Sequence, residues 1–190
     1  QEKIRKKGVS LVPEDRMIYG IADIASIEEN VISDRFTDKR FNKGPLFNMP
    51  EIHQESNNLI IDYRILAKSH QQQVKMLSGG NIQKVVVARE LSSKPTLLIA
   101  DQPTRGIDVG ATEFIRNEIV ELSRNGAAVL LVSADLNEVI ELSDSLIVMY
   151  GGKIVAYFED SNQLEDVTMG EYMLGLNRQT DEEIARVCYE

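Results

Sequence analysis

One stretch of the 190-residue chain, residues 76–110, constrains the fold more than any other. Its first half is the segment LSGGN at residues 77–81, followed by an apolar periodic run over residues 82–91. Ser78 can cap the start of a helix there, and the two glycines let a ligand approach the backbone closely. A helix start of this kind presents free N–H groups and the positive end of the helix dipole, which suit a phosphate group.

The second half of the stretch is a short apolar run, residues 96–100, that ends at Asp101. This pattern predicts a buried parallel strand. The C-terminal ends of such strands are where open α/β sheets bind ligands, and a carboxylate there suits Mg²⁺. We therefore expect an α/β fold with Asp101 as a candidate magnesium ligand.

Together these segments resemble the nucleotide-binding domain of ABC-type ATPases. LSGGN with Gln83 resembles the signature motif of that family, LLIAD at residues 97–101 its Walker B strand, and residues 102–108 the segment that runs into its D-loop. Each pattern alone is common, whereas the linked set in this order is specific. The resemblance implies ATP and Mg²⁺ as cofactors, Asp101 as metal ligand, and the following nucleotide-binding residues: Glu14, Ser78, Gly79, Gly80, Asn81, Gln83 and Asp108.

Composition limits the alternatives. A hydrophobic content of 43% and a charged content of 27% are ordinary for a soluble globular protein, and the formal net charge of −9 argues against a nucleic-acid-binding surface. Cys188 is the single cysteine, which excludes an intramolecular disulfide and fits a reducing cytosol. No apolar run approaches the length of a membrane span and no signal peptide is visible, so we expect any membrane role to act through a partner.

The apolar pattern predicts an α/β layer structure with a mostly parallel sheet and an antiparallel hairpin at one end. The turn signal of the hairpin is Gly151-Gly152 between two apolar runs. The expected strands are residues 8–12, 96–101, 128–133, 145–150 and 153–157.

Residues 26–92 are expected to be largely helical and set to one side of the sheet. Ser26 with the acids that follow it is typical of a capped helix start, and the polar residues 34–50, with two prolines, favour a loop. Further helices are expected at residues 51–67, 82–91, 111–124 and 136–142, and the acidic residues beyond 158 are also expected to be helical.

The P-loop pattern, Gly-x-x-x-x-Gly-Lys-Ser/Thr, occurs nowhere in the chain. Because ABC domains carry it N-terminal to a strand like residues 8–12, the chain resembles the C-terminal portion of one nucleotide-binding domain, and the isolated chain is expected to bind ATP weakly or not at all. The resemblance divides the chain into a helical subdomain with the signature motif at about residues 26–92, the Walker B half of the core at 93–158, and a C-terminal tail at 159–190.

The chain also departs from the family pattern at its own catalytic positions. Gln102 stands where the family has the catalytic Glu, and an amide can position a water but cannot accept its proton. Ala134 stands where the family has its switch histidine, a role that neither His53 nor His70 fills, and both of these read as ordinary surface or helix residues. Glu14 is the best match to the Q-loop glutamine, and a solvated turn is an equal alternative there.

An intact signature beside a degenerate catalytic position implies that the motif completes the ATP site of a partner domain. The pattern is similar to the second ABC domain of bacterial sugar and nucleoside importers. That resemblance implies a second ABC domain, on the same chain or in a homodimer, transmembrane permease subunits, an indirect lipoprotein partner and a peripheral place on the cytoplasmic face of the membrane. A catalytically silent nucleotide-binding or docking module, and a non-transport ABC ATPase acting in DNA repair or chromosome structure, remain as alternatives.

Overall fold

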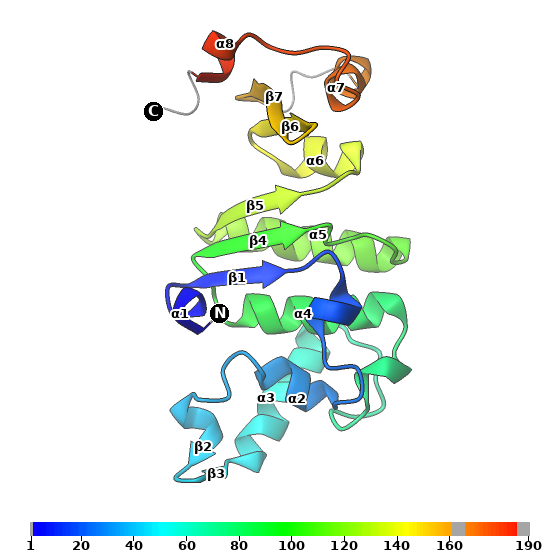
Figure 1. The fold of residues 1–190 in the computed structure, drawn as a ribbon. Helices are drawn as coiled ribbons and strands as arrows, with labels where there is room; N and C mark the ends of the chain where they lie inside the picture. The colour runs from blue at the N-terminus through cyan, green and yellow to red at the C-terminus, as the bar shows by residue number, and fades with distance from the viewer. Residues whose placement is uncertain (1, 161–165, 186–190) are drawn as a thin grey trace. The chain divides into compact units, whose positions relative to one another are not determined.

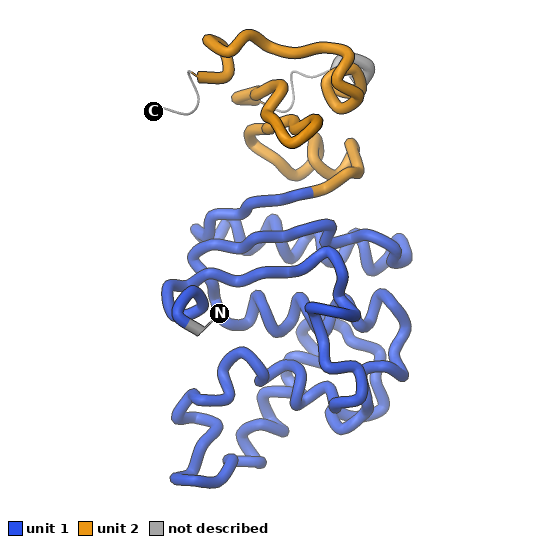
Figure 2. Tube along the Cα trace, viewed as in Figure 1, with its two compact units in different colours: residues 1–132 blue, residues 133–190 orange. Residues whose placement is uncertain are grey.

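The computed structural model describes residues 2–160 and 166–185. The chain forms two compact units, unit 1 at residues 1–132 and unit 2 at residues 133–190, which Figure 2 shows in separate colours. Cys188 and part of the acidic tail lie outside the described residues, so the predictions made for them are not addressed by the structure.

Unit 1 contains a three-stranded parallel sheet in the order β1-β4-β5, as Figure 1 shows. Its strands are β1 (Val9–Val12), β4 (Leu97–Asp101) and β5 (Ala128–Val132). The residues that alternate along these strands face opposite sides, so Val12, Leu98 and Ala100 are buried while Leu11 and Leu130 are about half exposed. The predicted strands of the parallel sheet are therefore confirmed.

Helices α4 (Gly79–Ser92) and α5 (Val109–Arg124) cover the buried face of this sheet. Their apolar stripes meet the strands in one core, which explains why the amphipathic pattern of α5 and the apolar run of α4 form helices in this context. The side chains of this core are Val12, Val86, Val87, Leu91, Leu98, Ala100, Ile115 and Ile119.

Residues 26–92 are largely helical, as predicted. Ser26 caps α2 (Ile27–Ile32) through a capping box with Glu29, and α3 (Met49–Asp62) packs beside it, away from the sheet (Figure 1). A second core holds these helices to α4, and its buried side chains include Ile27, Val31, Phe41, Ile52, Leu59, Ile65, Val74, Ile82 and Val85. Unit 1 also contains the short helical segments α1 (Glu2–Arg5), η1 (Arg16–Gly20) and η3 (Val74–Met76).

Two boundaries in this region differ from the prediction. The expected loop at residues 34–50 contains η2 (Lys39–Phe41) and a small antiparallel pair, β2 (Asn42–Lys43) with β3 (Leu46–Phe47), because Gly44 takes a left-handed turn between them.

The helix expected at residues 51–67 instead spans Met49–Asp62, with a proline in its first turn. It ends early because Arg64 is left-handed at φ 50°, and the N–H of Ile65 donates to the carbonyl oxygen of Ile60, which closes the last turn.

Unit 2 contains α6 (Leu136–Leu142), β6 (Leu146–Tyr150), β7 (Lys153–Phe158), α7 (Asp166–Met173) and α8 (Asp181–Ala185). The expectation that the hairpin extends the parallel sheet is wrong. Within the described residues, β6 and β7 pair only with each other, as a separate two-stranded sheet. The two glycines at the turn, with φ of 56° and 76°, close the hairpin locally, so its strands satisfy each other's hydrogen bonds.

None of the helices within residues 2–160 and 166–185 combines the length and the apolar character that crossing a membrane requires.

Candidate functional site

The start of α4 is built around Ser78. Its backbone is extended, at φ −68° and ψ 159°, and its Oγ accepts hydrogen bonds from the backbone N–H of Asn81 at 3.5 Å and from Nδ2 of Asn81 at 2.8 Å. The Oδ1 of Asn81 in turn accepts from the N–H of Leu66 at 2.8 Å. Because these bonds use Oγ only as an acceptor, the hydroxyl proton of the exposed Ser78 is left to donate outward.

The two glycines after Ser78 differ in their surroundings. A Cβ at Gly80 would lie 2.6 Å from Oδ2 of Asp108 and 2.9 Å from Cβ of Ala111, so α4 and the start of α5 approach too closely for any side chain. A Cβ at Gly79 would lie 3.3 Å from Nη2 of Arg16, the tip of a flexible side chain. Gly80 is therefore required by packing, whereas Gly79 faces a more open surface.

Asp108 lies at the start of α5, where that helix approaches Gly80 of α4. It is the N-cap of α5, and its Oδ1 accepts from the backbone N–H of Ala111 at 2.9 Å. The start of α4, where Gly80 lies, and the start of α5 are thus packed against each other, and the structure brings Asp108 to the signature residues.

Gln83 is nearly fully buried, at 2% exposure, one turn into α4. Its Nε2 donates to the carbonyl oxygen of Pro103 at 2.7 Å, while its buried Oε1 has no partner among the described atoms. The side chain therefore ties the signature helix to the segment that follows β4, and it does not reach the surface.

Glu14 forms an ion pair with Arg105, and both side chains are more than half exposed. Next to them, Arg16 donates to the carbonyl oxygens of Arg105, at 2.9 Å, and Gly106, at 3.3 Å. Sequence reasoning did not single out Arg16, which links the segment after β1 to the segment after β4 and lies beside Gly79. The only signal was its position in the short polar segment that follows β1.

Asp101 is the last residue of β4 and is partly exposed, and no hydrogen bond or ion pair engages its carboxylate within the described residues. Such a carboxylate fits a Mg²⁺ ligand. The next residue, Gln102, is left-handed at φ 49°, and its N–H donates to the carbonyl oxygen of Val132 at 2.7 Å. A non-glycine residue in this conformation at a strand end is uncommon, and the sequence pattern did not predict it.

Ala134 lies in unit 2 and is exposed, two residues after the end of β5 in the chain. It carries no group that could contact a phosphate. The structure thus brings together the signature residues, Gln83, Asp108 and the Glu14–Arg105 pair in unit 1, and it leaves Ala134 in the other unit.

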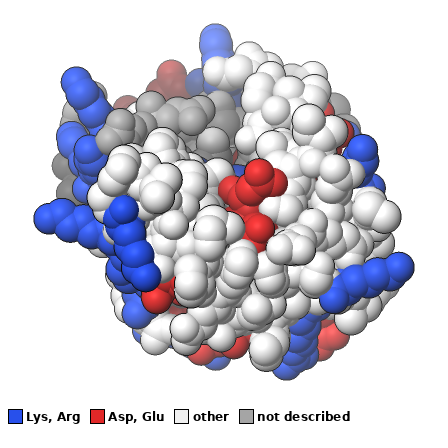
Figure 3. Space-filling view, turned by 90° about the horizontal axis from the view of Figure 1, so that it is seen from below, with Lys and Arg blue, Asp and Glu red and all other residues white. Residues whose placement is uncertain are grey.

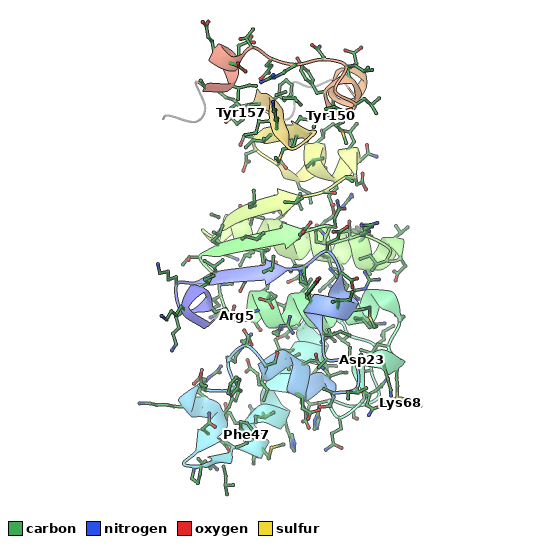
Figure 4. The ribbon with its side chains drawn as sticks, viewed as in Figure 1. Arg5, Asp23, Phe47, Lys68, Tyr150 and Tyr157 are labelled. Carbon is green, nitrogen blue, oxygen red and sulfur yellow. The ribbon has the colours of Figure 1, made fainter. Side chains whose placement is uncertain are left out.

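A buried charge cluster that sequence reasoning missed lies near the C-terminal end of α4, at the opposite end of the helix from Ser78. Glu90, fully buried in α4, accepts from Nη1 and Nη2 of Arg5 at 2.8 Å each and from Nε of Arg89 at 2.8 Å. Figure 4 labels Arg5 on α1. Burial alone would raise the pKa of Glu90, but the hydrogen bonds and charges of Arg5 and Arg89 outweigh it and lower the pKa below its ordinary value.

Comparison with solved structures places this fold among ATP-binding cassettes. The chain is similar to the ATP-binding cassette MJ0796 in a dimeric, post-hydrolysis state bound to ADP and Pi, with a TM-score of 0.68, 21% identity, and coverage of 82% of this chain and 64% of that chain. It is also similar to the cassette MJ1267 in its ADP conformation, with a TM-score of 0.59 and 18% identity, covering 100% of this chain and 71% of that one. The profile of the ABC transporter family matches residues 1–105, and the chain therefore belongs to that family.

Curated relatives carry more sequence identity. The glucose import ATP-binding protein TsgD13 of Haloferax volcanii is 43% identical over 150 residues, which is 78% of this chain and 27% of that protein. The guanosine import ATP-binding protein NupO of Bacillus subtilis is 36% identical over 154 residues, which is 81% of this chain and 30% of that protein. The chain thus spans less than a third of the length of these relatives.

Proposed function

We propose that this chain is part of the ATP-binding subunit of an ABC importer for simple sugars or nucleosides, in which it supplies the signature motif to a partner domain. Relatives named for glucose and guanosine import support this substrate range. The chain corresponds to the C-terminal portion of one nucleotide-binding domain, with residues 26–92 as its helical subdomain, 93–158 as the Walker B half of the core and 159–190 as a tail.

The observation that carries the proposal is a contrast between the start of α4 and the end of β4. The start of α4 keeps an exposed Ser78 hydroxyl and a partly exposed backbone at Gly79, a donor set that suits the terminal phosphate of ATP held by another domain. The position after Asp101 instead carries Gln102, which can orient a water but cannot act as a base. Ala134 likewise offers no contact to a phosphate.

The sheet of unit 1 supports the assignment to part of a larger domain. Parallel sheets are covered on both faces, yet Leu11 at 46% and Leu130 at 53% stay exposed on the face opposite α4 and α5. Within the described residues, β5 pairs only with β4, so its outer edge also has unpaired backbone groups. We infer that P-loop-bearing segments of the same nucleotide-binding domain cover this face and edge.

A contact with permease subunits is suggested by exposed apolar side chains on η1. Met17, Ile18 and Tyr19 of η1 are 48%, 68% and 77% exposed, an apolar group next to Arg16 that suits docking onto permease subunits. This contact would hold the protein at the cytoplasmic face of the membrane, with the substrate-binding lipoprotein engaged only through the permease. Mg²⁺ would be held by Asp101 and would supply charge neutralisation of the phosphates.

Uptake by the assembled importer tests this function. The protein, its partner ABC domain and its permease are reconstituted in proteoliposomes, and uptake of labelled glucose, ribose, galactose, xylose and guanosine is measured with ATP inside. We expect ATP-dependent uptake of at least one of these solutes. Uptake of none, together with ATP hydrolysis that no solute stimulates, would contradict the importer assignment.

A catalytically silent nucleotide-binding or docking module is the second candidate, favoured by Gln102 and Ala134. A DNA-repair or chromosome ATPase is disfavoured by the net charge of −9. Figure 3 agrees for the face that it shows, where Lys and Arg side chains lie mainly around the edge and a group of acidic side chains lies near the centre, so that no single basic surface forms.

A further inference from the structure

Two histidines and a buried glutamate converge in the helical part of unit 1, away from the signature residues. The Nδ1 of His70 lies 2.5 Å from Oε2 of Glu28, and Nε2 of His53 lies 3.4 Å from the same oxygen. The possible metal-ligand atoms of the three side chains all lie within 4.8 Å of one another. We propose that Glu28, His53 and His70 bind one divalent transition-metal ion, and this proposal does not rest on the proposed transport function.

Each ligand comes from a different element. Glu28 is in the first turn of α2, His53 is in the second turn of α3, and His70 is in the loop between α3 and η3, which Figure 4 marks with Lys68. The backbone N–H of Glu28 donates to the carbonyl oxygen of His70 at 3.0 Å, which sets the loop in register against α2. A metal ion here would therefore connect three segments that otherwise meet through this loop and the apolar core.

The charge of Glu28 is the second argument. Its side chain is only 11% exposed, and within the described residues its carboxylate contacts the two imidazoles and no lysine or arginine. Glu90, the other buried acid described above, has two arginines beside it. Burying a carboxylate is costly unless a positive charge lies beside it, and the two imidazoles are positive only when protonated, so a bound cation would supply a permanent charge here.

The donor set selects the kind of ion. Two imidazole nitrogens and one carboxylate oxygen are the ligands of Zn²⁺ and of neighbouring first-row metals such as Co²⁺ and Ni²⁺, whereas Mg²⁺ and Ca²⁺ prefer oxygen alone. Donors around tetrahedral zinc lie about 3.3 Å apart, given Zn–N bonds of roughly 2.0 Å. The 3.4 Å between Nε2 of His53 and Oε2 of Glu28 already matches this spacing, whereas the 2.5 Å between Nδ1 of His70 and the same oxygen would have to lengthen when an ion binds.

Zinc binding through histidine can be assigned to this cluster directly, because the chain has only two histidines and both are in the cluster. The 190-residue chain is purified without an affinity tag, stripped with a chelator, and titrated with ZnCl₂ by calorimetry. We expect one Zn²⁺ per chain and a Tm that rises with Zn²⁺ concentration. His53→Gln and His70→Gln should each weaken Zn²⁺ binding at least 10- to 100-fold. Replacing a residue that only hydrogen-bonds to a metal ligand typically causes a loss of this size, and these two residues would be ligands themselves.

The matched control is Glu51→Gln, which changes another acid on α3 and should keep the wild-type affinity. X-ray absorption of the zinc-loaded wild type provides a readout that does not depend on the variants folding, and two imidazole nitrogens on the metal are expected. No binding at about 1 mM Zn²⁺, unchanged affinity in both histidine variants, or a zinc spectrum without imidazole would overturn the proposal.

Discussion

The Nε2 of Gln83, inside α4, donates a 2.7 Å hydrogen bond to the carbonyl oxygen of Pro103, the residue after Gln102. This one buried contact couples α4 to the segment that follows β4. The two parts of the sequence that most constrain the fold, at the start of α4 and at the end of β4, are therefore linked by a buried side chain.

Replacing Gln83 tests this coupling. Gln83→Met removes the donor and leaves the carbonyl oxygen of Pro103 buried without its partner, so we expect a loss of about 1–3 kcal/mol in the free energy of unfolding, measured with urea. Gln54→Met, an exposed change on α3, is the control and should stay within about 0.5 kcal/mol of wild type. Equal midpoints and slopes for the two variants would refute the coupling.

Gly80 and Gly79 should respond differently to a methyl group. Gly80→Ala places Cβ 2.6 Å from Oδ2 of Asp108 and 2.9 Å from Cβ of Ala111, so we expect overpacking of about 1–3 kcal/mol and a Tm lowered by roughly 2–12 °C. Gly79→Ala places Cβ 3.3 Å from the movable tip of Arg16 and at an ordinary contact distance of 3.7 Å from the carbonyl oxygen of Gly106, so it should change Tm by much less. The idea fails if Gly79→Ala destabilises the chain as much as Gly80→Ala does.

The ion pair between the buried Glu90 and the partly exposed Arg5 should make the free energy of unfolding depend on pH. Glu90→Gln removes the carboxylate that both Arg5 and Arg89 contact, and leaves Arg5 with only the more distant Asp34 at 3.6 Å, so we expect it to cost about 3 kcal/mol at pH 7. Because the pKa of Glu90 is lowered in the folded chain, its contribution is present above its ordinary pKa of 4.5 and is lost as the pH falls below that value. The gap between wild type and variant should therefore narrow below about pH 4.5.

The control for this titration is Glu113→Gln, an exposed acid on α5, which should track wild type throughout. Urea unfolding of the three proteins at several pH values measures the gap. A gap that stays constant down to pH 3, or widens, would show that Glu90 does not carry this charge interaction.

The 190-residue chain should bind ATP weakly or not at all. In this family the P-loop backbone and its lysine supply most phosphate contacts, and this chain offers only the few donors at the start of α4. Calorimetry with MgATP on the purified chain is expected to show no saturable binding at micromolar ATP. Tight binding with a stoichiometry near one would mean that another part of the chain forms a nucleotide site.

Local signals in the sequence predicted most of the fold. Ser26 and Ser78 cap helices as expected, because capping depends on a few neighbouring residues, whereas the cap at Asp108 was not predicted. The early end of α3 depends on a left-handed Arg64, for which the sequence pattern has no sign. The separation of β6 and β7 from the parallel sheet depends on strand pairing, which alternation alone does not decide.

For the candidate site, the sequence predicted the positions of individual residues along the chain but not the contacts between residues far apart in sequence. Motif positions such as Ser78 and Asp101 lie where the resemblance implied, at a helix start and a strand end. The pairing of Glu28 with His70 joins residues 42 positions apart, and that of Arg5 with Glu90 joins residues 85 apart. Contacts at such separations follow from the packing of α1, α2 and α4 and leave no periodic trace in the sequence.

The central claim is that this chain completes the ATP site of its partner and has no base of its own. Steady-state ATPase rates of the assembled importer test it with Ser78→Arg, Gln102→Ala and, as a matched control, the exposed Ser123→Arg. Ser78→Arg fills the phosphate site, so we expect it to abolish hydrolysis, while Ser123→Arg keeps the wild-type rate. Losing a positioned base costs roughly 10²- to 10⁴-fold, and Gln102→Ala should cost far less because no base is lost. If Gln102→Ala is as inactive as Ser78→Arg, this chain's own site is catalytic and the account is wrong.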